Sequence, residues 1–168
     1  RDHALYVLEL SSFQLDGIRA FRPHIAVLLN ITPDHLDRYQ YNMDHYVASK
    51  FRIAMNQNAS DHFIHSDDDP EVRRGLTEHP VRARRWPISI EHHVPEGGFL
   101  QDGLLHFNAS THPDPNPLRM SLIELALQGK HNAYNSMAAG IAARILEVRK
   151  ETVRESLSDF QNVEHRLE

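Results

Sequence analysis

Short apolar runs alternate with polar or amphipathic stretches along the first half of the chain. The runs at residues 4–10 and 25–30 are typical of strands buried on both faces of a parallel sheet. Residues 11–21 lie between them and have room for a short helix. The elements expected next are a strand at 62–65, a charged helical stretch at 69–78 and a strand at 81–86. This alternation predicts an α/β fold in which a mostly parallel sheet is flanked by helices.

The pattern changes after residue 88. Two turn signals, Glu96-Gly97-Gly98 and Gln101-Asp102-Gly103, surround short strands such as residues 104–107. We therefore expect a small antiparallel excursion of the sheet at residues 88–117. The elements expected beyond it are a strand at 120–127, a long alanine-rich helix at 131–148 and a helix at 151–160.

Residues 43–57 have the clearest helical pattern of the chain, and Asn42 is a suitable N-cap. At about 100° per residue, most apolar side chains of this helix share one arc, while Ser49 and Arg52 face the other way. Lys50 falls inside the apolar arc. Either its methylenes pack while the ammonium reaches water, or the lysine points into a site where desolvation favours the neutral amine.

Polar residues follow three of the predicted strands: Glu9 with its successors, residues 30–35 and residues 129–135. Open α/β sheets bind ligands at this edge, so we expect the three segments to converge. Glu9 and His35 offer oxygen and nitrogen ligands for a divalent cation, and magnesium is favoured if phosphates supply the remaining oxygens. The alternative is that these residues only cap helices and form turns.

Residues 129–135 begin the long helix, whose first backbone N–H groups and positive dipole end suit anions. Asn132 and Asn135 are three positions apart and share a face, so their amides are placed to contact one ligand together. Helix capping is the alternative role for both. The apolar residues of this helix form an ordinary core stripe of Tyr134, Met137, Ala138, Ile141, Ala142 and Ile145.

The composition narrows the class of protein. A chain of 168 residues with 40% hydrophobic and 24% charged residues fits one soluble domain. We find no secretory signal and no apolar run long enough to cross a membrane. The absence of cysteine excludes disulfides and thiolate metal sites and fits a cytoplasmic location. The net charge of −5 argues against general binding of nucleic acid.

Five segments together resemble the Mur ligase family of peptidoglycan synthesis, in the order and spacing of that family. They are Leu8–Leu15, Leu29–Tyr39, Ser49–Ile53, Gly129–Asn135 and His165–Glu168. The match spans nearly the whole chain. Within the family, Ser-Ser-Phe-Gln-Leu favours the members that add D-glutamate, because the members that add a diamino acid usually have Ser-Ser-His there.

The resemblance implies an ATP-driven amide ligation. The carboxylate of UDP-N-acetylmuramoyl-L-alanine would take the γ-phosphoryl group of ATP, and the amine of D-glutamate would then attack the acyl phosphate. By similarity, Glu9 would help to hold the magnesium that bridges the ATP phosphates, while His35 and a carbamylated Lys50 would hold a second magnesium. Neither a nucleic acid nor a membrane is implied as a partner.

The resemblance also assigns the remaining site residues. Ser11 would contact the muramoyl substrate, and Asn132, Asn135 and Arg166 would contact ATP. Arg166 would otherwise be an ordinary solvated charge near the end of the chain.

The chain also departs from the family pattern. The phosphate loop expected upstream of Glu9 is absent, as are the N-terminal and C-terminal domains, so we expect residues 1–168 to be a partial central ATP-binding domain, P-loop NTPase-like and inactive alone. A second hypothesis is another ligase of this family or the related folylpolyglutamate synthase. A third is a nucleotide- or metal-binding module without catalytic activity.

Overall fold

The computed structural model describes residues 5–34, 36–109 and 116–159. Within these ranges the chain forms one sheet with the strands in sequence order. The strands are β1 (Ile25–Leu28), β2 (His62–Ser66), β3 (Arg84–Ser89), β4 (Gly97–Gln101), β5 (Leu104–Asn108) and β6 (Leu118–Ser121). Pairing is parallel from β1 to β4 and antiparallel from β4 to β6. The predicted α/β class and the antiparallel excursion are both confirmed.

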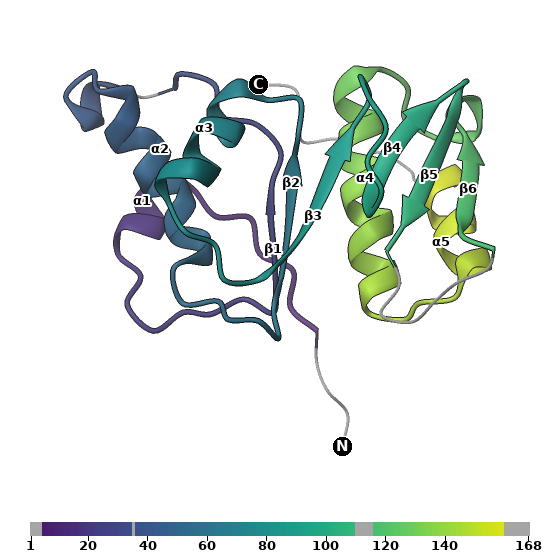
Figure 1. Ribbon diagram of the computed structural model, residues 1–168, viewed down its shortest axis with the longest axis horizontal. Helices are drawn as coiled ribbons and strands as arrows, with labels where there is room; N and C mark the ends of the chain where they lie inside the picture. The colour runs from purple at the N-terminus through teal and green to yellow at the C-terminus, as the bar shows by residue number, and fades with distance from the viewer. Residues whose placement is uncertain (1–4, 35, 110–115, 160–168) are drawn as a thin grey trace.

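Helices cover both faces of the sheet. They are α1 (Ser12–Asp16), α2 (Met43–Phe51), α3 (Pro70–Glu78), α4 (Lys130–Ile145) and α5 (Lys150–Ser158), with 3-10 turns η1 (Leu36–Tyr39), η2 (Arg52–Ala54) and η3 (Leu122–Glu124). Figure 1 shows α1–α3 on one side of β1–β3 and α4 on the other. The neighbours Phe63 and Ile64 in β2 belong to different buried clusters, as expected where successive strand residues point to opposite faces.

Local hydrogen bonds explain where the helices begin. The Asn42 carboxamide oxygen accepts from the backbone N–H of Asp44 at 2.8 Å, which confirms it as the N-cap of α2. Asp69 caps α3 in the same way by accepting from the backbone N–H of Val72 at 2.8 Å. Ser11 caps α1. The starts of these three helices follow from the polar residue that precedes each of them.

The predicted strand at residues 4–10 is wrong for its described part. Residues 5–10 pair with no strand of the described sheet, and Leu5, Tyr6, Val7 and Leu8 are 59–91% exposed. An apolar run becomes a strand only when a neighbouring strand satisfies its backbone groups, and the described part of β1 pairs only with β2.

Several other boundaries differ from the prediction. β3 begins at Arg84 instead of residue 81, because its register is set by parallel pairing with β2, where Arg84 lies opposite His62. β6 spans Leu118–Ser121 and then turns into η3, so the strand expected at 120–127 is shorter and starts earlier. α2 ends at Phe51 and tightens into η2.

α4 packs closely on the sheet at Gly140. A Cβ atom built at this position would lie 2.3 Å from Cε1 of Phe107, whose side chain is 2% exposed. The glycine therefore sets how near α4 approaches β5. This close approach fixes the helix that begins at residues 129–135.

We predict that Gly140→Ala lowers the free energy of unfolding by about 1–2 kcal/mol. Overpacking a core costs roughly 1–3 kcal/mol, and the better helix propensity of alanine recovers about 1 kcal/mol at most. Urea unfolding followed by circular dichroism measures the change. The exposed neighbour provides the control, because Ala139→Ser should stay within about 0.5 kcal/mol. A more stable Gly140→Ala variant would show that the ring of Phe107 moves aside without cost.

Candidate functional site

Segments that follow the parallel strands contact one another at one edge of the sheet. The backbone N–H of Ile31, after β1, donates to the Asp69 carboxylate at 3.4 Å. The backbone N–H of Asp67, after β2, donates to the Ile88 carbonyl of β3 at 2.8 Å. Tyr134 of α4 donates its hydroxyl to Asp68. Two of the three segments expected to converge, the described part of residues 30–35 and residues 129–135, are therefore joined through residues 67–69, whereas the convergence of Glu9 stays a prediction.

Asp68 connects these segments, and sequence reasoning did not identify it. Its side chain is 4% exposed and accepts from the Ser89 hydroxyl at 2.6 Å and from the Ile90 N–H at 2.8 Å. Burial alone would raise the pKa of Asp68, but the hydrogen bonds from Ser89, Tyr134 and Ile90 hold the pKa below its usual value. The available signal was a run of three aspartates directly after a strand.

The start of α4 leaves its first turn without a side-chain cap. Gly129 is the N-cap residue, with φ at 105°, and no capping side chain is present in the described structure. The Asn132 amide donates to the Gln128 carbonyl at 2.8 Å, and Asn135 is exposed. Neither asparagine is therefore the N-cap, and the capping alternative is wrong for both.

Lys50 lies at the boundary between the core and the candidate site. Its residue is half-buried, and its ammonium lies 5.4 Å from the centre of the Tyr46 ring. Burial lowers the pKa of Lys50, while the nearby charge of Asp34 acts in the opposite direction. The predicted arc is confirmed, because Tyr46 and Val47 on the same helix are buried.

Polar side chains of α2, of η2 and of Asn56 just beyond η2 hold the segment that contains α1. This role was missed, because the sequence shows only that Ser49 and Arg52 face away from the apolar arc. The bonds are Ser49 to the Ser12 carbonyl, Arg52 to the Leu15 and Ile18 carbonyls, and Asn56 to the Arg19 and Phe21 carbonyls, all at 2.8–3.0 Å. They fix the helix of Lys50 relative to α1, which begins just after Ser11.

Ser11 and Glu9 do not form a binding site together in the described structure. The Ser11 hydroxyl accepts from the Gln14 N–H at 3.3 Å, and Gln14 bonds back to the Ser11 N–H at 2.8 Å, so the capping role of Ser11 is confirmed. Glu9 is exposed in the extended segment 5–10. His35 and Arg166 lie outside the described residues.

Metal and membrane features were sought in the described ranges. Among residues 5–34, 36–109 and 116–159, no three His, Asp or Glu side chains lie close enough together to hold a metal ion. The described ligand candidates Glu9 and Lys50 therefore do not make a complete magnesium site by themselves. In the same part of the chain, no helix is both long and apolar enough to cross a membrane.

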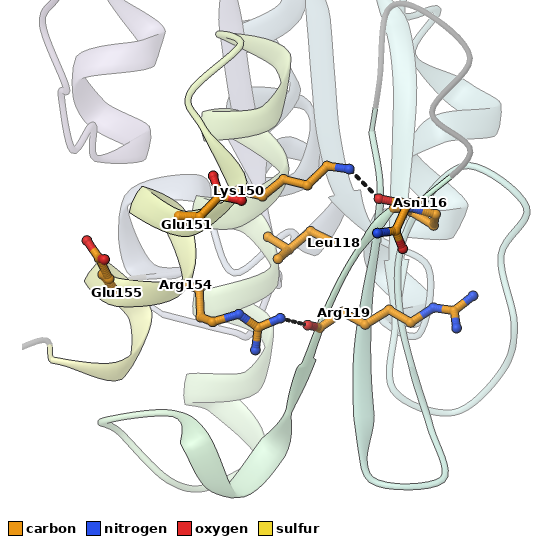
Figure 2. Close-up of a pocket in the computed structure, with 8 residues that line it drawn as sticks. Asn116, Leu118, Arg119, Lys150, Glu151, Arg154 and Glu155 are labelled. Atoms are coloured by element: carbon orange, nitrogen blue, oxygen red, sulfur yellow. Dashed lines mark hydrogen bonds between the residues drawn. The ribbon is translucent and has the colours of Figure 1, made fainter.

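A separate pocket of about 410 Å³ lies between β6 and α5 (Figure 2). Its cations already bind protein groups: Lys150 donates to the Asn116 carbonyl, and Arg154 donates to the Arg119 carbonyl and to Glu124. None of the predicted site residues that the structure describes lines this pocket. The pocket therefore reflects how α5 is attached to β6, the strand at the opposite edge of the sheet from β1.

Comparison with known sequences shows where this fold occurs. The model of the Mur ligase middle domain matches residues 1–143. The chain is 51% identical to UDP-N-acetylmuramoylalanine–D-glutamate ligase of Christiangramia forsetii over 99% of its own length and 36% of the relative's. It is 49% identical to the ligase of the same name in Bacteroides fragilis, with the same coverage. The chain thus spans about a third of the curated relatives it matches.

Solved structures show the same fold. A murein peptide ligase from Psychrobacter arcticus superposes with a TM-score of 0.64 at 20% identity, covering 88% of this chain and 29% of that one. UDP-N-acetylmuramate:L-alanyl-γ-D-glutamyl-meso-diaminopimelate ligase from Neisseria meningitides gives 0.63 at 22% identity, covering 84% and 41%. These likenesses support the α/β architecture of the described sheet.

We predict that Lys50 releases its proton at a lower pH than an ordinary lysine, because burial destabilises its charged form. The measurement is a pH titration of the lysine side-chain signals by NMR in the labelled chain. Asp34→Asn is the matched variant and should lower the pKa of Lys50 further, because it removes a charge that favours the ammonium. A Lys50 titration at or above the ordinary lysine range would contradict the desolvation.

Proposed function

The chain belongs to the Mur ligase family, and from this membership we propose that its parent protein adds D-glutamate to UDP-N-acetylmuramoylalanine with consumption of ATP. The observation that carries the proposal is the identity of 49–51% over almost the whole chain to relatives named for that reaction. We infer that residues 1–168 are a partial central ATP-binding domain. The phosphate loop and the N-terminal and C-terminal domains would lie elsewhere in the parent, and its location would be cytoplasmic, where ATP is available.

The geometry of the carboxyl edge supports nucleotide binding there. We assign Asn132 and Asn135 to ATP, because α4 presents them beside an uncapped first turn whose N–H groups suit phosphate oxygens. Arg166 would add a third contact to ATP. Ser11 would face the muramoyl substrate from the start of α1. Phosphoryl transfer depends mainly on positioning and on neutralising charge, and a rigid sheet edge provides the positioning.

We assign Glu9, His35 and Lys50 to magnesium, with Lys50 as a carbamate. The support is the chemistry of the donors, together with the burial that lowers the pKa of Lys50 and so favours a neutral amine able to add carbon dioxide. When bound, magnesium would neutralise charge on the phosphates. The described residues do not complete a metal site, so this assignment depends on His35 and on phosphate oxygens.

Phosphate release by the full-length parent tests the function. With ATP and UDP-N-acetylmuramoyl-L-alanine present, we predict that D-glutamate stimulates release far more than L-glutamate, L-lysine or meso-diaminopimelate. The isolated chain of 168 residues should form no amide above a control without protein. Phosphate release stimulated by another amino acid would favour a different ligase of the family. Folylpolyglutamate synthase is tested separately by adding folate substrates. A parent that binds nucleotide without turnover would favour the module without catalytic activity.

Variants of Lys50 in the full-length parent test the carbamate. We predict that Lys50→Ala loses most turnover and that a high concentration of acetate restores part of it, because the small carboxylate can occupy the vacated space. Lys50→Arg should be inactive, since a guanidinium keeps its charge and forms no carbamate. If Lys50→Arg were fully active in buffer depleted of carbon dioxide, Lys50 would be an ordinary packed lysine.

A further inference from the structure

Tyr134 attaches the beginning of α4 to the end of β2. Its hydroxyl donates to the carboxylate of Asp68, a residue 66 positions earlier in the chain. Asp68 is itself held by the Ser89 hydroxyl at 2.6 Å and the Ile90 N–H at 2.8 Å, both from the end of β3. The phenol is therefore bonded to a buried acceptor that two parallel strands keep in place.

Other side-chain bonds near the start of α4 are weak or local. Gly129 provides no cap, and a Cβ atom built at this position would meet no other group within 4 Å. Lys130 pairs with Glu91 at 3.3 Å, but both side chains are 59% exposed, and exposed pairs contribute little. The Asn132 amide bonds to Gln128, which lies in the same segment. Among these described bonds, only the one from Tyr134 ties the first turns of α4 to a buried group of the sheet.

The position of Tyr134 in the helix matters because it lies between the two asparagines. Asn132 and Asn135 share one face, whereas Tyr134 is rotated by about 100° from Asn135 and about 200° from Asn132. Its hydroxyl can therefore hold the helix from the sheet side while the amide of Asn135 stays exposed. A rotation or shift of this turn would move both amides together.

We propose that Asp68 and Tyr134 are positioning residues for the nucleotide, because their bond fixes the rotation and height of the turn that presents Asn132 and Asn135. This inference rests on the proposed function, which assigns the two asparagines to ATP. Neither Asp68 nor Tyr134 needs to contact the nucleotide. Because their bond already orders the first turns of α4, ATP binding has to order less of the protein, and the affinity for ATP is higher.

The protonation states suit this role. Burial and the neighbouring Asp68 raise the pKa of Tyr134, so its hydroxyl keeps its proton at neutral pH. The hydrogen bonds described above hold the pKa of Asp68 below its usual value, so the carboxylate remains an acceptor. A donor that keeps its proton and an acceptor that stays ionised make a charge-assisted bond.

Tyr134→Phe in the full-length parent tests the proposal, because it removes the hydroxyl and keeps the ring. We expect the KM for ATP, and the dissociation constant of a nonhydrolysable ATP analogue measured by calorimetry, to rise by about fivefold or more. The kcat at saturating ATP and the KM for the muramoyl substrate should change by less than about twofold. Tyr41→Phe is the matched control and should change none of these, since Tyr41 is 80% exposed.

A second pair of variants separates positioning from general stability. Asp68→Ala should raise the KM for ATP at least as much as Tyr134→Phe, whereas Asp68→Asn keeps one acceptor oxygen and should restore part of the loss. Melting temperatures without nucleotide are measured for all variants. If Tyr134→Phe lowered the melting temperature but left ATP binding unchanged, the bond would be structural only and the proposal would be overturned.

Asn132→Ala and Asn135→Ala distinguish failure of this inference from failure of the proposed function. If both raise the KM for ATP and Tyr134→Phe does not, the positioning role is wrong and the nucleotide assignment stands. If neither asparagine variant affects ATP, the nucleotide assignment itself is wrong, and the positioning role fails with it.

Discussion

The buried carboxylate of Asp68 must find hydrogen-bond donors, and it finds them, as do its neighbours Asp67 and Asp69, mostly in segments far apart in the sequence. His92 pairs with Asp67 at 2.8 Å, Tyr134 donates to Asp68, and the N–H groups of Ile31 and Val72 donate to Asp69. Leaving such a group unsatisfied would cost about 1–3 kcal/mol or more, so the loops settle where these bonds are complete. The carboxyl edge is therefore shaped by the acceptors at the end of one central strand.

Much of the architecture could be predicted because its signals are local. The cap at Asn42 and the strand at residues 62–65 depend on a few adjacent residues, and both were found at the expected places. Boundaries that depend on a neighbour were missed. Pairing with a neighbouring strand decides whether residues 5–10 form a strand and where β3 begins. The sequence of one segment does not show which strand it pairs with.

The candidate site divides in the same way. The partial burial of Lys50 follows from helical periodicity and was visible in the sequence. The bond between Tyr134 and Asp68 was not, because Tyr134 fits the core stripe of α4 and its partner lies 66 positions away. The roles of Ser49 and Arg52 were hidden for a related reason, since a polar helix face looks the same whether it meets water or a carbonyl group.

The bonds from α2, η2 and Asn56 to the α1 segment have a consequence for how this region tolerates substitutions. The donors are the side chains of Ser49, Arg52 and Asn56, but the acceptors are backbone carbonyls, which every amino acid possesses. Exposed positions of this segment, such as Arg19 and Ala20, can therefore drift in sequence while the course of the backbone is maintained, whereas Leu15 stays constrained because its side chain is buried. The three donor side chains have no such freedom, because another side chain could not make the same bonds. Among homologues, substitutions should therefore be frequent at the exposed acceptor positions and rare at Ser49, Arg52 and Asn56.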